Sequence, residues 1–342
     1  MTTILFPLVL FGWLAGHLEV GEAKDSNGPP APAVDARLFD FPQRLFAFEL
    51  EQKLDAPAYT VSSLRFPSPL DSPDPVNNTV HAEYFQPRGE GRRSGVIVLH
   101  ILGADFALSR YLAARLADQG VAALFVKLPY YGERRPQDDA RFLSTDLNRS
   151  VFAMRQAVCD IRRAASWLQS RPEIDPKRLG ITGISLGGIM SALSAGVDSR
   201  FSRAALLLAG GNLAEILWSM PEAKRYRAAW IAAGGTKATL EAITRPYDPL
   251  RFAHNLRDRD VLMIAGRVDE VVPPPCTEEL WRTAGRPPLI WYDCGHYSAV
   301  GYLLPAIRET VHFFTTKDGA IPRRDEASGP TGSNARPTPP AQ

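Results

Sequence analysis

Several features that would point directly to a function are scarce or missing in this sequence. The 342 residues include three cysteines, Cys159, Cys276 and Cys294, and their odd number and wide spacing argue against a disulfide framework or a thiolate metal site. The formal net charge is only +2, so no basic surface indicates nucleic-acid binding. The sequence also lacks an H-E-x-x-H helix, a phosphate-binding loop and a dinucleotide-binding glycine fingerprint. We therefore expect no metal and no organic cofactor.

The sequence also lacks a long apolar run. A short apolar run lies near the N-terminus. It extends from Ile4 to Gly16 and is followed by small residues near Ala23, a pattern that resembles a secretory signal peptide. We expect this signal over residues 1–23 with cleavage after Ala23, although no lysine or arginine precedes the run. The run is too short for a membrane span. The expected location is secreted or periplasmic, and it would otherwise be cytoplasmic.

Two stretches of small and polar residues flank the expected folded domain. Residues 24–35 combine Gly, Pro and Ala with charges and predict a flexible linker. Residues 317–342 are rich in Pro, Gly, Ser and Arg and contain no aromatic residue, which predicts a disordered tail. The remaining residues, 36–316, are enough for one domain with a sizeable core.

The first part of this domain mixes two patterns. Residues 36–54 combine aromatic and charged residues and predict a short helix packed on the domain. Residues 59–66 and 79–85 alternate apolar with polar side chains and are separated by turn residues. They predict half-exposed antiparallel strands at a sheet edge.

From residue 95 onward, short apolar runs alternate with amphipathic segments. Continuously apolar runs are typical of strands covered on both faces, and they occur at 96–99, 121–126, 178–182, 204–208, 261–265 and 289–292. The alternation predicts an α/β fold with a mostly parallel central sheet and helices on both faces. A helical insertion at 211–258 contains Trp218, Tyr226 and Trp230. It is expected either as a small lid that carries these aromatics over a pocket or as an ordinary helical excursion whose aromatics pack on the core.

Ser185 lies within Gly-Ile-Ser-Leu-Gly, between an expected strand and an expected helix. Glycines on both sides relieve the crowding of a sharp strand-to-helix turn, which exposes the serine at its tip. The positive N-terminal end of the following helix would face an oxyanion formed there. We interpret Ser185 as a candidate nucleophile.

A serine nucleophile needs a general base and an acid that orients the base. His296 follows an expected strand and would lie at the same sheet edge as Ser185, so it is the candidate base. His312 lies within an expected helix, which favours a structural role. The loop after the strand at 261–265 offers Asp269 and Glu270, of which Asp269 is the preferred acid.

The oxyanion hole would be formed by backbone N–H groups. One is expected from Leu186, directly after the nucleophile, and the other from Ile101 or, less favourably, Leu102, in the turn after the strand at 96–99. His100 is expected to stabilise that turn. Three aromatic residues are candidates for the substrate pocket, with packing as their alternative role: Tyr130, Tyr131 and Trp218.

Residues 183–187, 266–273 and 295–296, with 99–103 ahead of them, resemble the α/β-hydrolase superfamily. The resemblance covers about 96–314. Over this range the sequence is similar to the dienelactone hydrolase, acetyl xylan esterase and prolyl-oligopeptidase-like branches. It implies an α/β-hydrolase fold with a nucleophile, an acid and a base in the order Ser185, Asp269 and His296. Many relatives carry glycine where this chain has Ile101, and dienelactone hydrolases often use cysteine as the nucleophile.

We predict a serine hydrolase of the carboxylesterase type that acts on a small-molecule ester through an acyl-enzyme. A peptidase or amidase with the same triad is the alternative enzyme, disfavoured because only about 95 residues precede the hydrolase pattern. A non-catalytic binding protein with this fold is the alternative from another class, disfavoured because all three triad positions are filled. No pattern indicates the oligomeric state or the size of the acyl and alcohol groups.

Overall fold

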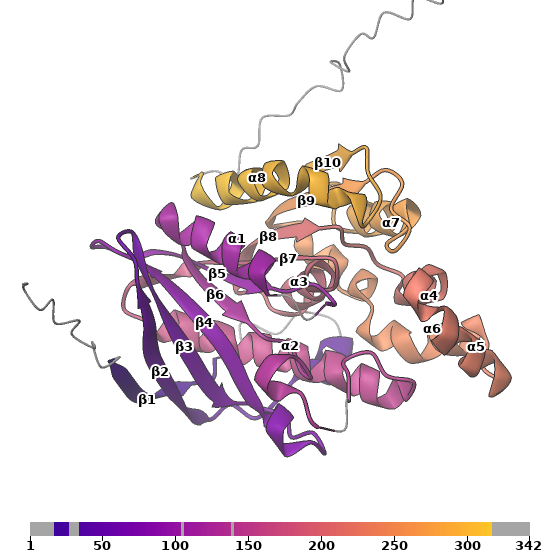
Figure 1. The fold of residues 1–342 in the computed structure, drawn as a ribbon, viewed down its shortest axis with the longest axis horizontal. Helices are drawn as coiled ribbons and strands as arrows, with labels where there is room; N and C mark the ends of the chain where they lie inside the picture. The colour runs from indigo at the N-terminus through magenta and orange to yellow at the C-terminus, as the bar shows by residue number, and fades with distance from the viewer. Residues whose placement is uncertain (1–16, 27–33, 104–105, 138–139, 317–342) are drawn as a thin grey trace, which may run out of the picture.

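The computed structural model describes residues 17–26, 34–103, 106–137 and 140–316 (Figure 1). The expected tail at 317–342 and residues 1–16 of the expected signal peptide lie outside the described residues. Within the described ranges, no helix is both long and apolar enough to cross a membrane.

A ten-stranded mixed sheet runs through the protein in the order β1-β2-β3-β4-β6-β5-β7-β8-β9-β10. The strands are β1 (Leu18–Lys24), β2 (Leu45–Asp55), β3 (Tyr59–Pro67), β4 (Thr79–Pro87), β5 (Arg93–Leu99), β6 (Ala122–Val126), β7 (Ile174–Ile184), β8 (Phe201–Leu207), β9 (Asp260–Gly266) and β10 (Leu289–Tyr292). Pairing is antiparallel from β1 to β4 and between β4 and β6, and parallel from β6 through β10. The predicted α/β fold with a largely parallel sheet is confirmed.

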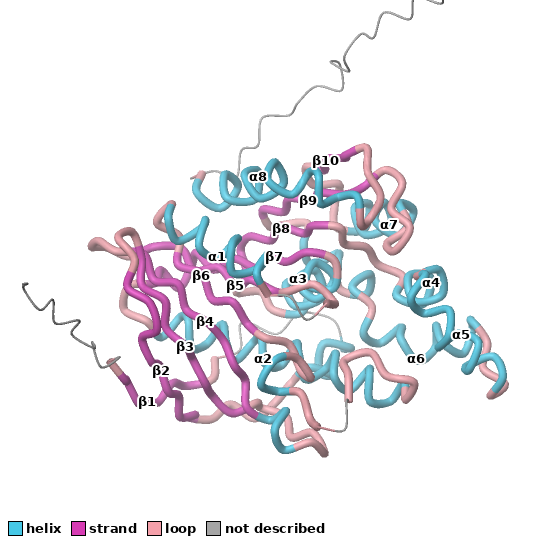
Figure 2. Tube along the Cα trace, viewed as in Figure 1, coloured by secondary structure: helices cyan, strands magenta, loops and turns pink. Residues whose placement is uncertain are grey.

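Helices cover both faces of the parallel half of the sheet. One core packs the sheet against α2 (Leu147–Ser170) and α3 (Leu186–Val197), and a second packs it against α1 (Ala107–Asp118) and α8 (Leu303–Thr315). Ile97 and Leu99 belong to the first core, whereas Val96 and Val98 belong to the second. Since successive strand residues point to opposite faces, a strand buried on both faces must be apolar throughout. Figure 2 shows the helices gathered around this half.

The prediction of a helix over 36–54 is wrong. The chain forms a short 3₁₀ helix, Val34–Phe39, and then strand β2. Phe46, Phe48 and Leu50 are buried and alternate with exposed residues. This period of two is that of a strand with one buried face. The two expected antiparallel strands are present as β3 and β4, but β1 and β2 extend the sheet beyond them.

The structure also differs from the expected linker at its first residues. β1 pairs with β2 over the whole of Leu18–Lys24. The carboxylate of Asp25 is buried and lies 2.6 Å from the guanidinium of Arg163 on α2. Residues 24–26 therefore belong to the folded domain, and 27–33 lie outside the described residues. Cleavage after Ala23 stays a prediction, and its product would lack β1.

The insertion at 211–258 lies between β8 and β9 and is helical, as expected. Its helices are α4 (Leu213–Ser219), α5 (Lys224–Ala232) and α6 (Lys237–Thr244), followed by short 3₁₀ turns up to Leu256. Figure 1 shows these helices gathered at the side of the molecule opposite β1–β4.

Candidate active site

Ser185 lies at the junction of β7 and α3 in a backbone conformation that non-glycine residues rarely adopt. Its φ is 57° and its ψ is −117°. Such a conformation costs on the order of 1–3 kcal/mol and persists only where the surrounding structure enforces it. Here the N–H of Ser185 donates a 2.9 Å hydrogen bond to the carbonyl of Leu207, which ties the turn to β8.

Gly183 and Gly187 allow this turn to close. A Cβ atom on Gly183 would lie 2.5 Å from the carbonyl carbon of Gly187, and one on Gly187 would lie 2.5 Å from the carbonyl oxygen of Leu99. Both neighbours are backbone atoms, which cannot rotate aside as a side chain can. Glycine is therefore required at both positions for the turn to pack against the end of β5.

The loops after β7, β9 and β10 bring Ser185, Asp269 and His296 into hydrogen-bond contact. Nε2 of His296 lies 2.8 Å from Oγ of Ser185, and Nδ1 lies 2.8 Å and 3.0 Å from the two carboxylate oxygens of Asp269. With Nδ1 donating to the carboxylate, Nε2 is left to accept the serine proton. This is the geometry that a serine nucleophile requires of its base.

The carboxylate of Asp269 is fixed by the backbone as well as by the histidine. Its side chain is buried, and Oδ1 accepts hydrogen bonds from the N–H groups of Val271 at 2.9 Å and Val272 at 2.7 Å. These bonds orient the carboxylate before it meets the imidazole.

Glu270, the second acid candidate, has a different contact. Its carboxylate accepts a 2.8 Å hydrogen bond from the backbone N–H of His296 and not from the imidazole. A Cβ atom on Gly295 would overlap this carboxylate, so glycine at that position leaves room for the bond. Glu270 thus holds the backbone of the histidine loop, whereas Asp269 holds the ring.

His100 holds the turn in which Ile101, the second candidate oxyanion donor, lies. The N–H of Leu128 donates to Nε2 of His100 at 3.0 Å, so the ring proton must be on Nδ1, which donates to the carbonyl of Ile101 at 2.7 Å. The ring is fully buried, and burial lowers the pKa of His100 to about 4, so it stays neutral. His100 thereby joins the loop after β5 to the loop after β6, in agreement with the structural role expected of it.

The other expected oxyanion donor, Leu186, is the first residue of α3. Its N–H lies in the first turn of the helix, where backbone donors have no acceptor within the helix. The macrodipole of α3 places partial positive charge at the same point. This end of the helix can therefore stabilise negative charge that develops next to Ser185.

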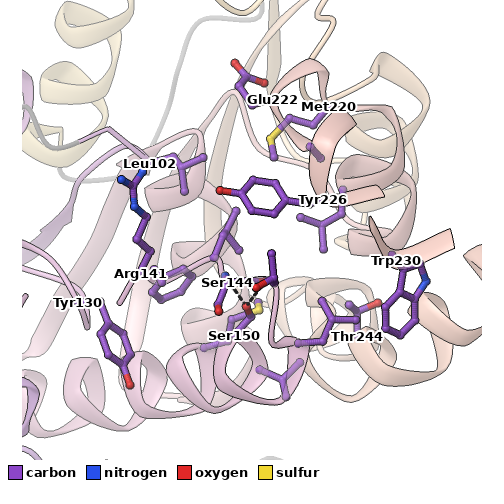
Figure 3. Close-up of a pocket in the computed structure, with 18 of the residues that line it drawn as sticks. Leu102, Tyr130, Arg141, Ser144, Ser150, Met220, Glu222, Tyr226, Trp230 and Thr244 are labelled. Carbon is purple, nitrogen blue, oxygen red and sulfur yellow. Dashed lines mark hydrogen bonds between the residues drawn. The ribbon is translucent and has the colours of Figure 1, made fainter. Parts of the chain in front are cut away.

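A cavity of about 830 Å³ lies at the carboxyl ends of β5 and β6, where Leu102 and Tyr130 line it (Figure 3). The loops after β5 and β6, the first half of α2 and the insertion helices form its walls. The three predicted pocket residues, Tyr130, Tyr131 and Trp218, all line it. Ser185, Asp269 and His296 are not among its lining residues. Its lining residues Leu102 and Gly103 directly follow the turn held by His100, which carries Ile101.

The two tyrosines are fixed by hydrogen bonds to neighbouring segments. Tyr130 has a φ of 67°, its N–H donates to Oδ1 of Asn77 at 3.0 Å, and its hydroxyl donates to Asp74 at 3.0 Å. The hydroxyl of Tyr131 donates to the carbonyl of Leu102 at 2.7 Å. Burial raises the pKa of Tyr130 to about 12 and that of Tyr131 further. Both tyrosines therefore shape the cavity wall in their neutral forms.

The insertion also contributes Tyr226 and Trp230, two of the aromatic residues expected on a lid over the pocket. Sequence reasoning missed the lining from α2, such as Met154. Met154 follows the apolar spacing of an ordinary core helix, and nothing in the sequence marks it as facing a cavity. Within the described ranges, no group of three or more His, Cys, Asp or Glu residues could hold a metal ion.

Two family models and several known proteins match parts of this sequence. The family model "Alpha/beta hydrolase domain containing 18" matches residues 37–209, and that of the prolyl oligopeptidase family matches residues 154–285. The uncharacterized protein Rv2627c of Mycobacterium tuberculosis is 29% identical over 202 residues, which cover 56% of this chain and 46% of the relative. The putative hydrolase YtaP of Bacillus subtilis is 27% identical over 146 residues, which cover 42% of this chain and 45% of the relative. The matched part thus spans about half the length of each relative.

Solved structures share the fold at low sequence identity. The acetyl xylan esterase from Paenibacillus sp. R4 superposes with a TM-score of 0.63 at 18% identity, covering 78% of this chain and 88% of that one. The acylaminoacyl peptidase of Pyrococcus horikoshii superposes with a TM-score of 0.57 at 15% identity, covering 80% and 45%. The first family model matches just over half of the chain, so the protein belongs to the alpha/beta hydrolase domain containing 18 family of the α/β-hydrolase superfamily.

Proposed function

We propose that this protein hydrolyses carboxylic esters through an acyl-enzyme on Ser185. The observation that carries the proposal is the continuous series of hydrogen bonds from Ser185 Oγ to His296 Nε2 at 2.8 Å and from His296 Nδ1 to Asp269 at 2.8 Å. Membership of the family supports a hydrolase of the esterase or peptidase type.

In the first half of the reaction, Oγ of Ser185 attacks the ester carbonyl carbon while Nε2 of His296 takes the hydroxyl proton. The carbonyl oxygen becomes an oxyanion, which the N–H groups of Leu186 and Ile101 stabilise. Asp269 stabilises the imidazolium that forms. When the tetrahedral intermediate breaks down, the C–O bond to the alcohol is cleaved, and His296 gives its proton to the leaving alkoxide.

In the second half, a water molecule replaces the alcohol. His296 takes a proton from the water as its oxygen attacks the acyl carbon, and the same N–H groups stabilise the second oxyanion. Collapse of this intermediate releases the carboxylic acid and returns the proton to Ser185. Loss of one oxyanion donor typically costs on the order of 10²–10³ in kcat.

A peptidase or amidase is the second candidate because the same groups can cleave an amide. The match to the prolyl oligopeptidase family over residues 154–285 includes both Ser185 and Asp269, and this match favours the candidate. An amide differs from an ester chiefly in its poorer leaving group, which His296 would have to protonate before the C–N bond breaks.

The experiment compares hydrolysis of p-nitrophenyl esters with hydrolysis of matched p-nitroanilides. Ser185→Ala is expected to abolish turnover of the esters. Ser191→Ala is the matched control, because Ser191 is a buried serine of α3, the helix that begins directly after Ser185, and its hydroxyl has no hydrogen-bond partner in the described structure. Turnover of anilides alone would replace the ester proposal with the amidase one. Equal ester turnover in the Ser185→Ala and Ser191→Ala variants would overturn the role of Ser185.

A further inference from the structure

The cavity beside the site is built mainly from apolar side chains. Phe142, Leu147 and Met154 form one wall, and Leu217, Met220 and Trp218 from the insertion form another. Its volume of about 830 Å³ falls within the range of roughly 300–1,000 Å³ that holds drug-sized ligands. A cavity of this size and composition favours a ligand that gains free energy by leaving water.

Three polar groups in the wall already donate hydrogen bonds within the protein, although charged side chains such as Arg141 and Glu222 also line the cavity. The hydroxyl of Thr244 donates to the carbonyl of Leu240 at 3.0 Å, and the indole N–H of Trp230 donates to the carbonyl of Thr236 at 3.0 Å. The hydroxyl of Tyr131 is likewise bonded to Leu102. Beside the apolar walls and these engaged donors, a sugar ring would lose hydrogen bonds to water without replacing them, whereas an apolar group loses none.

The strand order decides which part of the substrate meets the cavity. The loop after β7 carries Ser185, with the His296 loop on one side, after β10, and the loops after β5 and β6 on the other. The leaving alcohol must lie near His296 to receive its proton. The acyl group therefore points toward the β5 and β6 loops, where Gly103, Tyr131 and Leu102, the last labelled in Figure 3, border the cavity.

We propose that the cavity is an acyl-binding site and that the protein acts on esters of long apolar acyl groups rather than on acetyl esters. The assignment rests on the proposed function, because it takes Ser185 as the point at which the acyl group is attached. The cavity itself binds an apolar chain whether or not the ester is cleaved.

Two alanines on α5 provide a matched pair of variants. Ala229 and Ala228 are adjacent and both exposed, but only Ala229 lines the cavity. The wild-type kcat/KM is expected to rise on the order of 10-fold or more from p-nitrophenyl acetate to p-nitrophenyl decanoate. Ala229→Trp, which adds an indole to the cavity, should lower the decanoate-to-acetate ratio by about 10-fold, while Ala228→Trp should leave it unchanged. Val151→Trp, on the opposite wall, repeats the test from α2.

The second measurement is independent of turnover. Decanoic acid is titrated calorimetrically into the Ser185→Ala protein with and without Ala229→Trp, and acetic acid is the control ligand. Decanoic acid should bind, with affinity reduced by Ala229→Trp, and acetic acid should not. Binding without hydrolysis of any ester would keep the cavity assignment and reject the proposed function. A wild-type preference for acetate, or equal effects of the two α5 variants on decanoate, would overturn the acyl-site assignment even if esters are cleaved.

Discussion

The two halves of the central sheet use their side chains differently. In the parallel half, both faces are apolar and covered by helices, and Ser185, Asp269 and His296 are confined to loops beyond the strand ends. In the antiparallel half, one face packs on α2, while the other carries exposed ion pairs such as Arg65 with Glu49. The strand-end loops of one half thus hold the candidate catalytic residues, and the other half chiefly stabilises the fold.

The largest effect expected from this comparison concerns Asp269. Asp269→Asn should lower kcat by on the order of 10³–10⁴, because the amide no longer selects the tautomer that leaves Nε2 free to accept the serine proton. Glu270→Ala removes only the bond to the backbone N–H of His296 and should cost about 10-fold. Steady-state kinetics and thermal melting of both variants test the difference, and equal losses of kcat would contradict the separate roles.

In the antiparallel half, the corresponding test is Trp167→Ala. Trp167 is fully buried, with ring centroids 5.1 Å from Tyr84 on β4 and 5.8 Å from Phe48 on β2. Removing it should lower the free energy of unfolding by about 3–5 kcal/mol, because a large cavity is left between α2 and the sheet. The folded fraction should keep its kcat. Urea denaturation measures the free energy of unfolding. If kcat falls by more than the loss of folded protein accounts for, the two halves are coupled.

In the antiparallel half, breaking a buried ion pair should cost more stability than breaking an exposed one. Arg163→Met leaves the buried carboxylate of Asp25 unpaired and should cost about 3–5 kcal/mol of stability. Arg65→Met breaks an exposed pair with Glu49 and should cost less than about 1 kcal/mol. Denaturant unfolding of both variants checks the contrast. If the two costs are equal, Asp25 does not anchor the N-terminal segment as the structure indicates.

A pH dependence of the free energy of unfolding is expected from His100, which joins the loops after β5 and β6. Burial lowers the pKa of His100 to about 4, below the ordinary value of about 6.5 that it has when unfolded. The unfolded chain therefore binds the extra proton first, so the contribution is complete above about pH 6.5 and is lost as the pH falls toward 4. The loss reaches about 3 kcal/mol. Unfolding free energies at pH 7 and 4.5 should differ more in the wild type than in His100→Gln.

The sequence was sufficient to predict the parallel half and the three side chains that meet in the site. Continuous apolar runs mark strands buried on both faces, and Ser185, Asp269 and His296 each follow such a run. The helix expected over 36–54 was wrong because the buried residues of β2 are few and mixed with charges, so their period of two is weak. The contact of Glu270 with a backbone N–H and the cavity lining depend on tertiary packing, which local spacing does not reveal.

The central claim is that Ser185 is a nucleophile activated by His296. Covalent labelling with a fluorophosphonate, followed by mass spectrometry of the digested protein, tests it without assuming a substrate. The account predicts one phosphonyl adduct on the peptide that contains Ser185, absent in Ser185→Ala and formed much more slowly in Asp269→Asn. Labelling at another residue, or no labelling of the folded wild-type protein, would contradict it.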